Sequence, residues 1–326
     1  MKQVSLRDDA IMLANLIGRN LKLFLKDGMS VFFSLLSPLI ILILYILFLR
    51  DVQMDAVLGA FGNAPVDREL LETFVDNWML AGVISVACVT VSFSAQSITI
   101  KDREDGILAD LMAAPVKRGV LSAAYLISNL LITFSICAFV LAVSFVFAAG
   151  GEWTLSVGDA FSIIGWMVLS AAGAATLSTL ICGALKTSAQ HGAATGIMSA
   201  AIGFLMGAYM PLSIFPKAVQ YVALFLPGTY SASVFRNLYM EGALNKIAAQ
   251  LPSVEGVLED QFSMTLNFFG ETIGADVQAG IFAGIFVLTV LIWGVKEGVA
   301  AIRRKKSEGQ PNSRTETSDR PNDNRG

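Results

Sequence analysis

Side chains with catalytic or metal-binding chemistry are scarce in this sequence and do not cluster. His191 is the single histidine, and three cysteines lie in separate apolar runs, at Cys88, Cys137 and Cys182. Zinc sites need several cysteine or histidine ligands at short spacings, and no such spacing occurs. No catalytic triad and no carboxylate pair within an apolar run is visible. We therefore expect no metal, cofactor or catalytic residue on this chain, and interpret the cysteines as small packing residues.

The sequence also lacks the usual chemistry for driving transport. A phosphate-binding loop needs the pattern G-x-x-x-x-G-K-[ST], and the chain has none. Ion-coupled carriers usually hold ionisable residues near the middle of the bilayer, and the apolar runs hold almost none. If this protein moves a solute, the energy must come from elsewhere, and we expect this chain not to be an enzyme.

The densest group of charges is the stretch KDREDGILADLMAAPVKRG, from Lys101 to Gly119, between two long apolar runs. Acidic residues at its start suit a helix N-terminus. Pro115 should end the helix, because the residue before a proline avoids the helical conformation. An apolar stripe at helical spacing is formed by Ile107, Leu108, Leu111 and Met112. The pattern predicts a helix over 101–114, which either rests on lipid headgroups or docks a cytoplasmic partner.

The elements that must position this stretch are membrane helices. The chain is 55% hydrophobic and 15% charged, with a mean hydropathy of +0.64, whereas soluble domains are about 25% charged. A helix needs roughly 20 apolar residues to cross a bilayer, and the runs lack the alternation of barrel strands. The sequence therefore predicts an all-α integral membrane protein with six transmembrane helices, at about 30–49, 78–100, 120–148, 160–185, 192–210 and 277–295.

The distribution of basic residues orients these helices. Lysine and arginine number 18 on one set of alternate loops and 5 on the other, and the richer side is cytoplasmic. Both termini should then be cytoplasmic, with external loops at 50–77 and 211–276. Residues 1–29 read as a basic amphipathic helix on the inner leaflet. Residues 297–326 read as a basic segment followed by a disordered tail.

A short apolar segment inside the second external loop is bracketed by Pro216 and Pro227. Residues 217–226 are too few to cross the bilayer. The segment therefore predicts a re-entrant or interfacial helix between spans five and six. The net charge of −3 gives no basis for nucleic-acid binding.

The charged stretch resembles the intracellular loop of ABC type-2 permeases, the membrane subunits of many bacterial ABC exporters. That loop carries an acidic-Arg-acidic-x-Gly start, a leucine-rich helix, then Pro-Val and a basic residue. Ile107 departs from the threonine often found after the glycine. The matching residues are Asp102, Arg103, Glu104, Gly106, Leu108, Leu111, Pro115, Val116 and Arg118. A second match follows span five, at Pro227, Thr229, Tyr230 and Arg236.

The resemblance implies the permease of an ATP-driven exporter in the cytoplasmic (inner) membrane of a bacterium. Its substrate would be an amphipathic drug, lipid or peptide, and a separate ABC ATPase would dock on helix 101–114. One six-span chain is half of such a transporter, so the resemblance implies a homodimer, or a heterodimer with a related permease, surrounded by membrane lipid. Two alternatives remain: a non-transporting membrane scaffold or assembly factor, and a carrier or channel that needs no partner.

Span five also carries residues that suggest an interface. Gly203 and Gly207 form a G-x-x-x-G pair, which lets helices approach closely. In the resembled family spans one and five meet across the dimer, so we assign these glycines to that interface, with packing inside one subunit as the alternative. Phe204, Tyr209 and the helix-kinking Pro38 are candidates for a substrate path, although such residues are also ordinary in helix packing.

Overall fold

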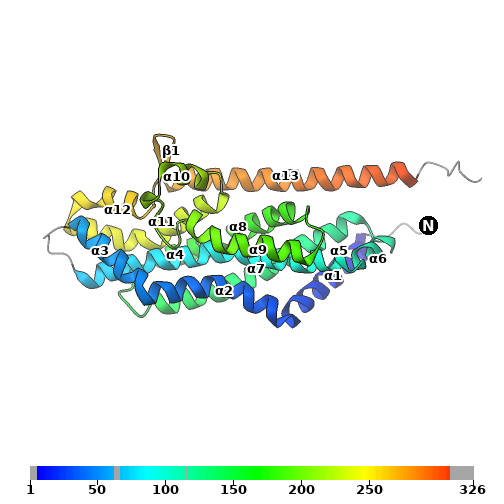
Figure 1. The fold of residues 1–326 in the computed structure, drawn as a ribbon, viewed down its shortest axis with the longest axis horizontal. Helices are drawn as coiled ribbons and strands as arrows, with labels where there is room; N and C mark the ends of the chain where they lie inside the picture. Colours follow the sequence, from blue (N-terminus) through cyan, green and yellow to red (C-terminus); the bar gives the residue numbers. More distant parts are fainter. Residues whose placement is uncertain (1–5, 62–66, 115, 309–326) are drawn as a thin grey trace, which may run out of the picture.

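The structure, a computed structural model, describes residues 6–61, 67–114 and 116–308 and is an elongated helical bundle (Figure 1). Its α-helices are α1 Leu6–Lys26, α2 Gly28–Leu44, α3 Arg50–Phe61, α4 Arg68–Ala95, α5 Ser97–Glu104, α6 Ile107–Ala113, α7 Arg118–Ala148, α8 Val157–Cys182, α9 Ser188–Leu205, α10 Lys217–Leu224, α11 Pro227–Gln250, α12 Glu255–Gln261 and α13 Ala275–Glu308. A π-helical turn, Tyr45–Leu49, joins α2 to α3, and 3-10 turns lie at Leu212–Ile214 and Pro252–Val254. Strands β1 Leu266–Phe268 and β2 Glu271–Ile273 form one antiparallel hairpin.

Across the described residues, five helical stretches are long and apolar enough to cross a membrane. They are Gly28–Gly59, Arg68–Glu104, Arg118–Ala148, Val157–Cys182 and Ala275–Ala300. They contain the predicted spans one, two, three and six and most of span four, whose helix ends at Cys182 rather than at residue 185, and the expectation of a helical membrane protein is confirmed. The predicted fifth span, 192–210, is helical only to Leu205, within α9. The first turns of α9 carry Gln190 and His191, so this helix is less apolar than the five.

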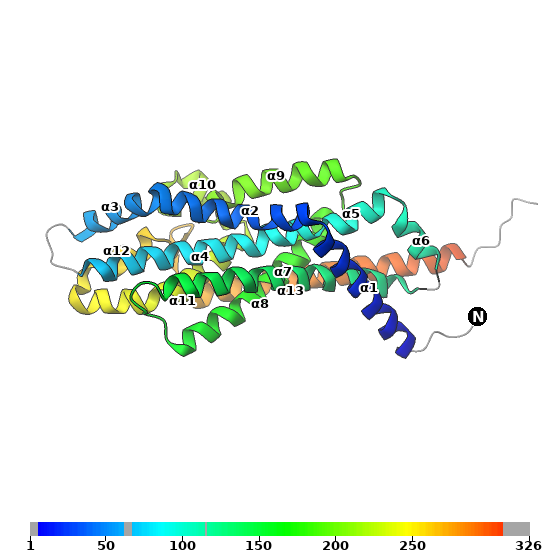
Figure 2. The same ribbon diagram turned by 90° about the horizontal axis from the view of Figure 1, so that it is seen from below.

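Helix α4 is the centre of the bundle. In its most apolar stretch 89% of the residues are buried, because α2, α7, α8, α9 and α11 all pack against it (Figure 2). Small residues allow this close packing. A Cβ atom at Gly82 would lie 3.2 Å from both Cα and Cβ of Ala208, where the chain has left α9. The positions of these five helices are therefore set by their contacts with α4.

A buried polar network ties α4, α7 and α8 together. Asn129 of α7 donates to the backbone carbonyl of Ser92 at 3.2 Å and to Ser178 Oγ at 3.1 Å. Gln96, just after α4, donates to Thr179 Oγ1 at 2.7 Å. Hydrogen bonds of this kind between polar side chains hold membrane helices together. The network holds three helices in register next to the charged stretch.

The predicted loop 50–77 is mostly helix in the structure, as α3 and the start of α4. The acidic side chain of Asp76 is mostly covered, with 18% of its surface exposed. Tyr45 donates to Asp76 Oδ1 at 2.6 Å, and Arg50 donates to both carboxylate oxygens at 2.9 and 3.0 Å. The π-helical turn places Tyr45 and Arg50 on the side that meets α4. This ion pair fastens that end of α2 to α4.

Helices α1, α10 and α13 lie where the sequence predicts helical segments. The predicted amphipathic segment 1–29 contains α1, and the predicted segment 217–226 contains α10. Helix α13 continues past the predicted span end to Glu308, so the helix includes the start of the predicted basic tail. The rest of the tail, 309–326, lies outside the described residues.

Candidate functional site

The charged stretch forms two short helices rather than the single predicted helix. α5 ends at Glu104 and α6 begins at Ile107, with Gly106 between them at φ +79°. A left-handed φ is easy for glycine and strained for residues with a Cβ atom. The space around Gly106 is open, so its backbone angle is what requires glycine. Pro115, the predicted helix stop, lies outside the described residues.

Replacing Gly106 with alanine should therefore destabilise the protein by about 1–2 kcal/mol, because alanine must adopt a left-handed conformation. The matched control is Gly119→Ala, at a helical glycine where an added Cβ would likewise meet nothing within 4 Å. Thermal unfolding of the two purified variants measures the difference. Equal melting temperatures would show that the bend between α5 and α6 carries no strain.

The apolar side of α6 faces the protein's own bundle. Leu108, Leu111 and Met112 are half-buried against a cluster that contains Phe24 of α1 and Leu121 of α7. The opposite side is exposed and consists of Ala109, Asp110 and Ala113. Leu108 and Leu111 therefore contact the bundle in the single chain, and their assignment to a docking helix stays a prediction. A partner that reaches α6 would meet small and acidic side chains.

Asp102 links this segment to the N-terminal helix. Its carboxylate is buried and accepts two hydrogen bonds from Arg19 of α1, at 2.7 and 2.8 Å. Tyr125 of α7 donates a third, at 2.6 Å. The hydrogen bond with Asp102 raises the pKa of the Arg19 guanidinium. Helix α1 is thereby held against both α5 and α7.

Arg103 and Glu104, which follow Asp102 in the sequence, hold the turn between α8 and α9. Arg103 Nη1 donates to the backbone carbonyls of Gly183, at 3.2 Å, and of Leu185. Glu104 accepts hydrogen bonds from the backbone N–H of Ser188, at 2.8 Å, and from its hydroxyl. The C-terminal carbonyls of a helix favour a cation, and the N-terminal N–H groups of a helix favour an anion. A displacement of α5 must therefore move the end of α8 and the start of α9.

The far end of α9 brings together four residues of the predicted interface and path. The Tyr209 ring packs directly on Gly203, where an added Cβ would fall 2.1 Å from the ring. The rings of Phe204 and Tyr209 have centroids 4.7 Å apart. Gly207, at φ +71°, lies in the turn after α9. The two glycines therefore do not form one helix face.

Arg236 stabilises this turn from α11. It is fully buried, and its Nη2 donates to the carbonyls of Met206 and Gly207 at 2.7 and 2.8 Å. Its Nη1 donates to the carbonyl of Ser263 at 3.3 Å. The predicted path residue Pro38 is not part of this group. It lines a separate apolar groove of about 270 Å³ between α2, α4 and α7.

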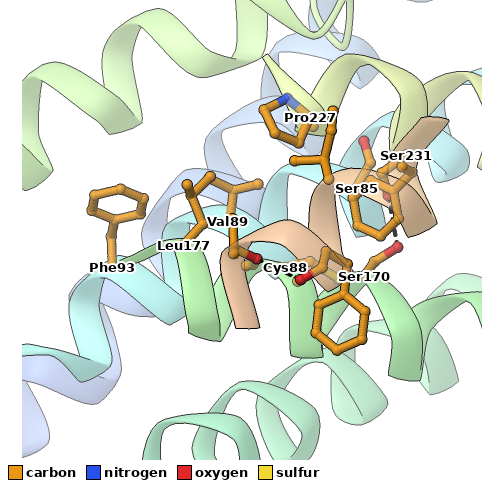
Figure 3. Close-up of a pocket in the computed structure, with 15 residues that line it drawn as sticks. Ser85, Cys88, Val89, Phe93, Ser170, Leu177, Pro227 and Ser231 are labelled. Atoms are coloured by element: carbon orange, nitrogen blue, oxygen red, sulfur yellow. Dashed lines mark hydrogen bonds between the residues drawn. The ribbon is translucent and has the colours of Figure 1, made fainter. Parts of the chain in front are cut away.

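A cavity in the middle of the bundle is too small for a substrate. It lies between α4, α8, α11 and α13 and has a volume of about 30 Å³, enough for about one water molecule. Ser170 and Ser231 share a 2.7 Å hydrogen bond at its edge (Figure 3). An amphipathic solute cannot pass through this cavity in the arrangement described. Over the parts of the chain that the structure covers, no group of His, Cys, Asp or Glu could hold a metal ion.

Sequence reasoning missed three residues that bind the charged stretch: Arg19, Tyr125 and Ser188. Each pairs with a residue at least 23 positions away. One signal was visible, since Ser188 follows Thr187 at the start of a helical pattern, which is typical of a helix N-terminus. Nothing local marks Arg19 or Tyr125 as partners of Asp102.

Residues 13–240 match the protein family described as ABC-2 type transporter. The matched region runs from α1 through the coupling residues and α9 into α11. No curated protein matches the chain.

Proposed function

Because the chain belongs to the ABC-2 type transporter family, and is thus a membrane permease component of an ABC transporter, we propose that it exports an amphipathic substrate with energy from a separate ATPase subunit. The substrate class comprises drugs, lipids and peptides. The ATPase binds ATP and Mg²⁺ and docks at α5 and α6. The membrane is the inner membrane of a bacterium.

The observation that carries this proposal is the connection from α5 to α9. Arg103 holds the end of α8 and Glu104 holds the start of α9, through charge-assisted hydrogen bonds. Asp102 holds α1 at the same place. A subunit that pushes on the exposed side of α6 would thus displace α1 and α9 together. Such a connection suits a protein whose energy arrives from outside the membrane.

The proposal includes six spans with both termini in the cytoplasm. α9 then completes the crossing as span five, with the turn at Gly207 near the outer surface, and α10 is the re-entrant helix. The excess of lysine and arginine on the α5–α6 side supports this orientation. The ion pair between Arg50 and Asp76 lies at the outer end.

Two copies, or this chain and a related permease, form the proposed transporter. The central cavity of one chain is too small for a substrate, which favours a path between subunits. An exposed face of α9 is made of small residues that allow close helix approach, at Ala189, Gly192, Ala193 and Gly196. Phe204 is exposed at the end of this face. We place the substrate path beside it.

The test is to purify the tagged chain from its native host in mild detergent and to identify its partners by mass spectrometry. A near-stoichiometric ATPase should accompany the wild-type protein. Asp110→Arg, on the exposed side of α6, should lower ATPase recovery at least about tenfold, since a reversed charge in a protein interface costs more than 1.4 kcal/mol. Asp55→Arg is the matched control, on an exposed site of α3 at the other end of the bundle.

Two results would contradict the proposal. If no ATPase accompanies the wild-type chain under conditions that preserve a known ABC complex, the scaffold or carrier alternatives are favoured. If Asp110→Arg and Asp55→Arg retain equal amounts of ATPase, the partner does not dock on α6.

A further inference from the structure

A second pocket lies at the same end of the bundle as the coupling residues. Its volume is about 190 Å³, and its walls come from α5, α6, α7, α8 and α13. Figures 1 and 2 show the C-terminal half of α13 running towards the end where α5 and α6 lie. The pocket therefore joins the coupling segment to α13, which the Arg103 and Glu104 contacts do not reach.

The pocket is rich in positive charge. Arg103, Arg118 and Lys296 line it from three different helices, and the only carboxylate in its lining is Glu297. Arg118 Nε is 3.6 Å from Glu297 Oε2, so one of the three cations is already paired. Within the described part of the chain, Lys296 forms no ion pair. The pocket therefore carries two positive charges that no carboxylate in its lining neutralises.

The pocket lining also holds a donor without an acceptor. The indole N–H of Trp293 is covered from solvent and has no hydrogen-bond partner among the residues described. A buried donor left unpaired costs about 1–3 kcal/mol, so such donors are rare unless a ligand or water completes them. Oε2 of Glu297 is also buried without a hydrogen bond, but Arg118 offsets its charge, so the surplus cations and the indole N–H call for a ligand with several acceptor oxygens.

The surroundings point to a lipid as the source of these oxygens. Leu108 and Met112 form part of the pocket wall, and three exposed apolar residues are next to lining residues in the sequence, at Ile181, Ile292 and Val295. Exposed apolar residues beside a cation cluster are typical of the boundary between acyl chains and headgroups. A soluble phosphate compound could pair with the cations but would make no contact with these apolar side chains.

We propose that this pocket binds the headgroup phosphate of an anionic phospholipid from the inner leaflet. Lys296 pairs with the phosphate and the charge of Arg103 adds to its attraction, the Trp293 N–H donates to a headgroup oxygen, and the first carbons of the acyl chains lie along α8 and α13. The bound lipid connects α6 to α13 and so stiffens the coupling segment. The assignment to the inner leaflet rests on the proposed orientation of the transporter.

The experiment uses the full chain, purified and reconstituted in nanodiscs of phosphatidylcholine with or without phosphatidylglycerol. Native mass spectrometry after ejection from the nanodisc counts retained phosphatidylglycerol, and thermal unfolding measures stabilisation. We expect wild-type protein to retain the anionic lipid and to melt at a higher temperature with it. Lys296→Gln should weaken retention about fivefold, as expected for one basic residue near anionic lipid. Trp293→Phe, which keeps an aromatic ring and deletes the N–H, should also weaken it.

The matched control is Lys186→Gln, an exposed lysine near the same end that does not line the pocket. It should retain lipid as the wild type does. Equal retention by the Lys296→Gln and Lys186→Gln variants would overturn the proposal, and so would equal stabilisation by inorganic phosphate in lipid-free detergent, which would identify a free phosphate as the ligand. The readout needs no ATPase, so it is independent of whether the partner test succeeds.

Discussion

Replacing Asp102 with alanine is expected to lower the free energy of unfolding by about 2–4 kcal/mol. Removing one member of a buried ion pair costs about 3–5 kcal/mol, and the value here is lower because the Arg19 side chain is 30% exposed and can be rehydrated. Tyr125 also loses its acceptor. Thermal or denaturant unfolding of the reconstituted protein measures this change. The same variant should release α1 from α5 and thereby weaken ATPase-driven transport.

The control for this prediction is Asp9→Ala. Asp9 pairs with Lys117, whose side chain is mostly exposed, and an exposed pair contributes less than about 1 kcal/mol. A second variant, Asp102→Asn, keeps the shape and deletes the charge, so its loss should be intermediate. Unfolding curves for Asp102→Ala that match the wild type would show that the contact with α1 adds nothing to stability.

Replacing Arg236 with methionine is expected to cost about 3–5 kcal/mol and to loosen the turn after α9. Buried ion pairs can often be exchanged for apolar residues because both partners are replaced. Here the acceptors are backbone carbonyls, of Met206, Gly207 and Ser263, which no side-chain substitution removes. The Ser263 carbonyl keeps a second donor, the Ser233 hydroxyl, but those of Met206 and Gly207 lose theirs, and each buried carbonyl left without a donor costs about 1–3 kcal/mol. Thermal unfolding measures the loss of stability, and limited proteolysis between α9 and α10 measures the loosening of the turn.

Arg68→Met provides the comparison, because Arg68 is largely exposed and, among the residues that the structure describes, pairs only with Glu72 one helical turn away. Its loss should change stability by about 0.5 kcal/mol or less. Because α6 is distant from this turn along the chain, the Arg236 variant that survives folding should still bind the ATPase. If Arg236→Met unfolds like Arg68→Met, the buried guanidinium does not hold the turn.

The membrane class and five of the spans were predictable because span length and hydropathy are local properties of the chain. The bend at Gly106 was not predicted, since a single glycine inside a helical pattern is compatible with either a continuous helix or a break. The early end of α9 was missed for a similar reason. The apolar pattern continues through Tyr209, and only the contact of Arg236 with the turn shows where the helix stops.

The coupling site was predictable only in part. A resemblance identified Asp102, Arg103 and Glu104, and helical spacing correctly grouped Leu108 with Leu111. The spacing of apolar residues cannot show which side of α6 is buried. In the structure, Phe24 of α1 packs against its apolar side. The partners of the three charged residues come from distant segments, and a single sequence does not show which distant residues form pairs.

The central position of α4 also has an evolutionary consequence. A surface helix can change one residue at a time, whereas α4 meets five neighbouring helices and has little free surface. Gly82 and Ala208 are in close contact, so a bulkier side chain at either position requires a smaller one, or a shifted backbone, at the other. Among relatives of this chain these two positions should therefore vary together, and α4 as a whole should diverge more slowly than α3 or α12.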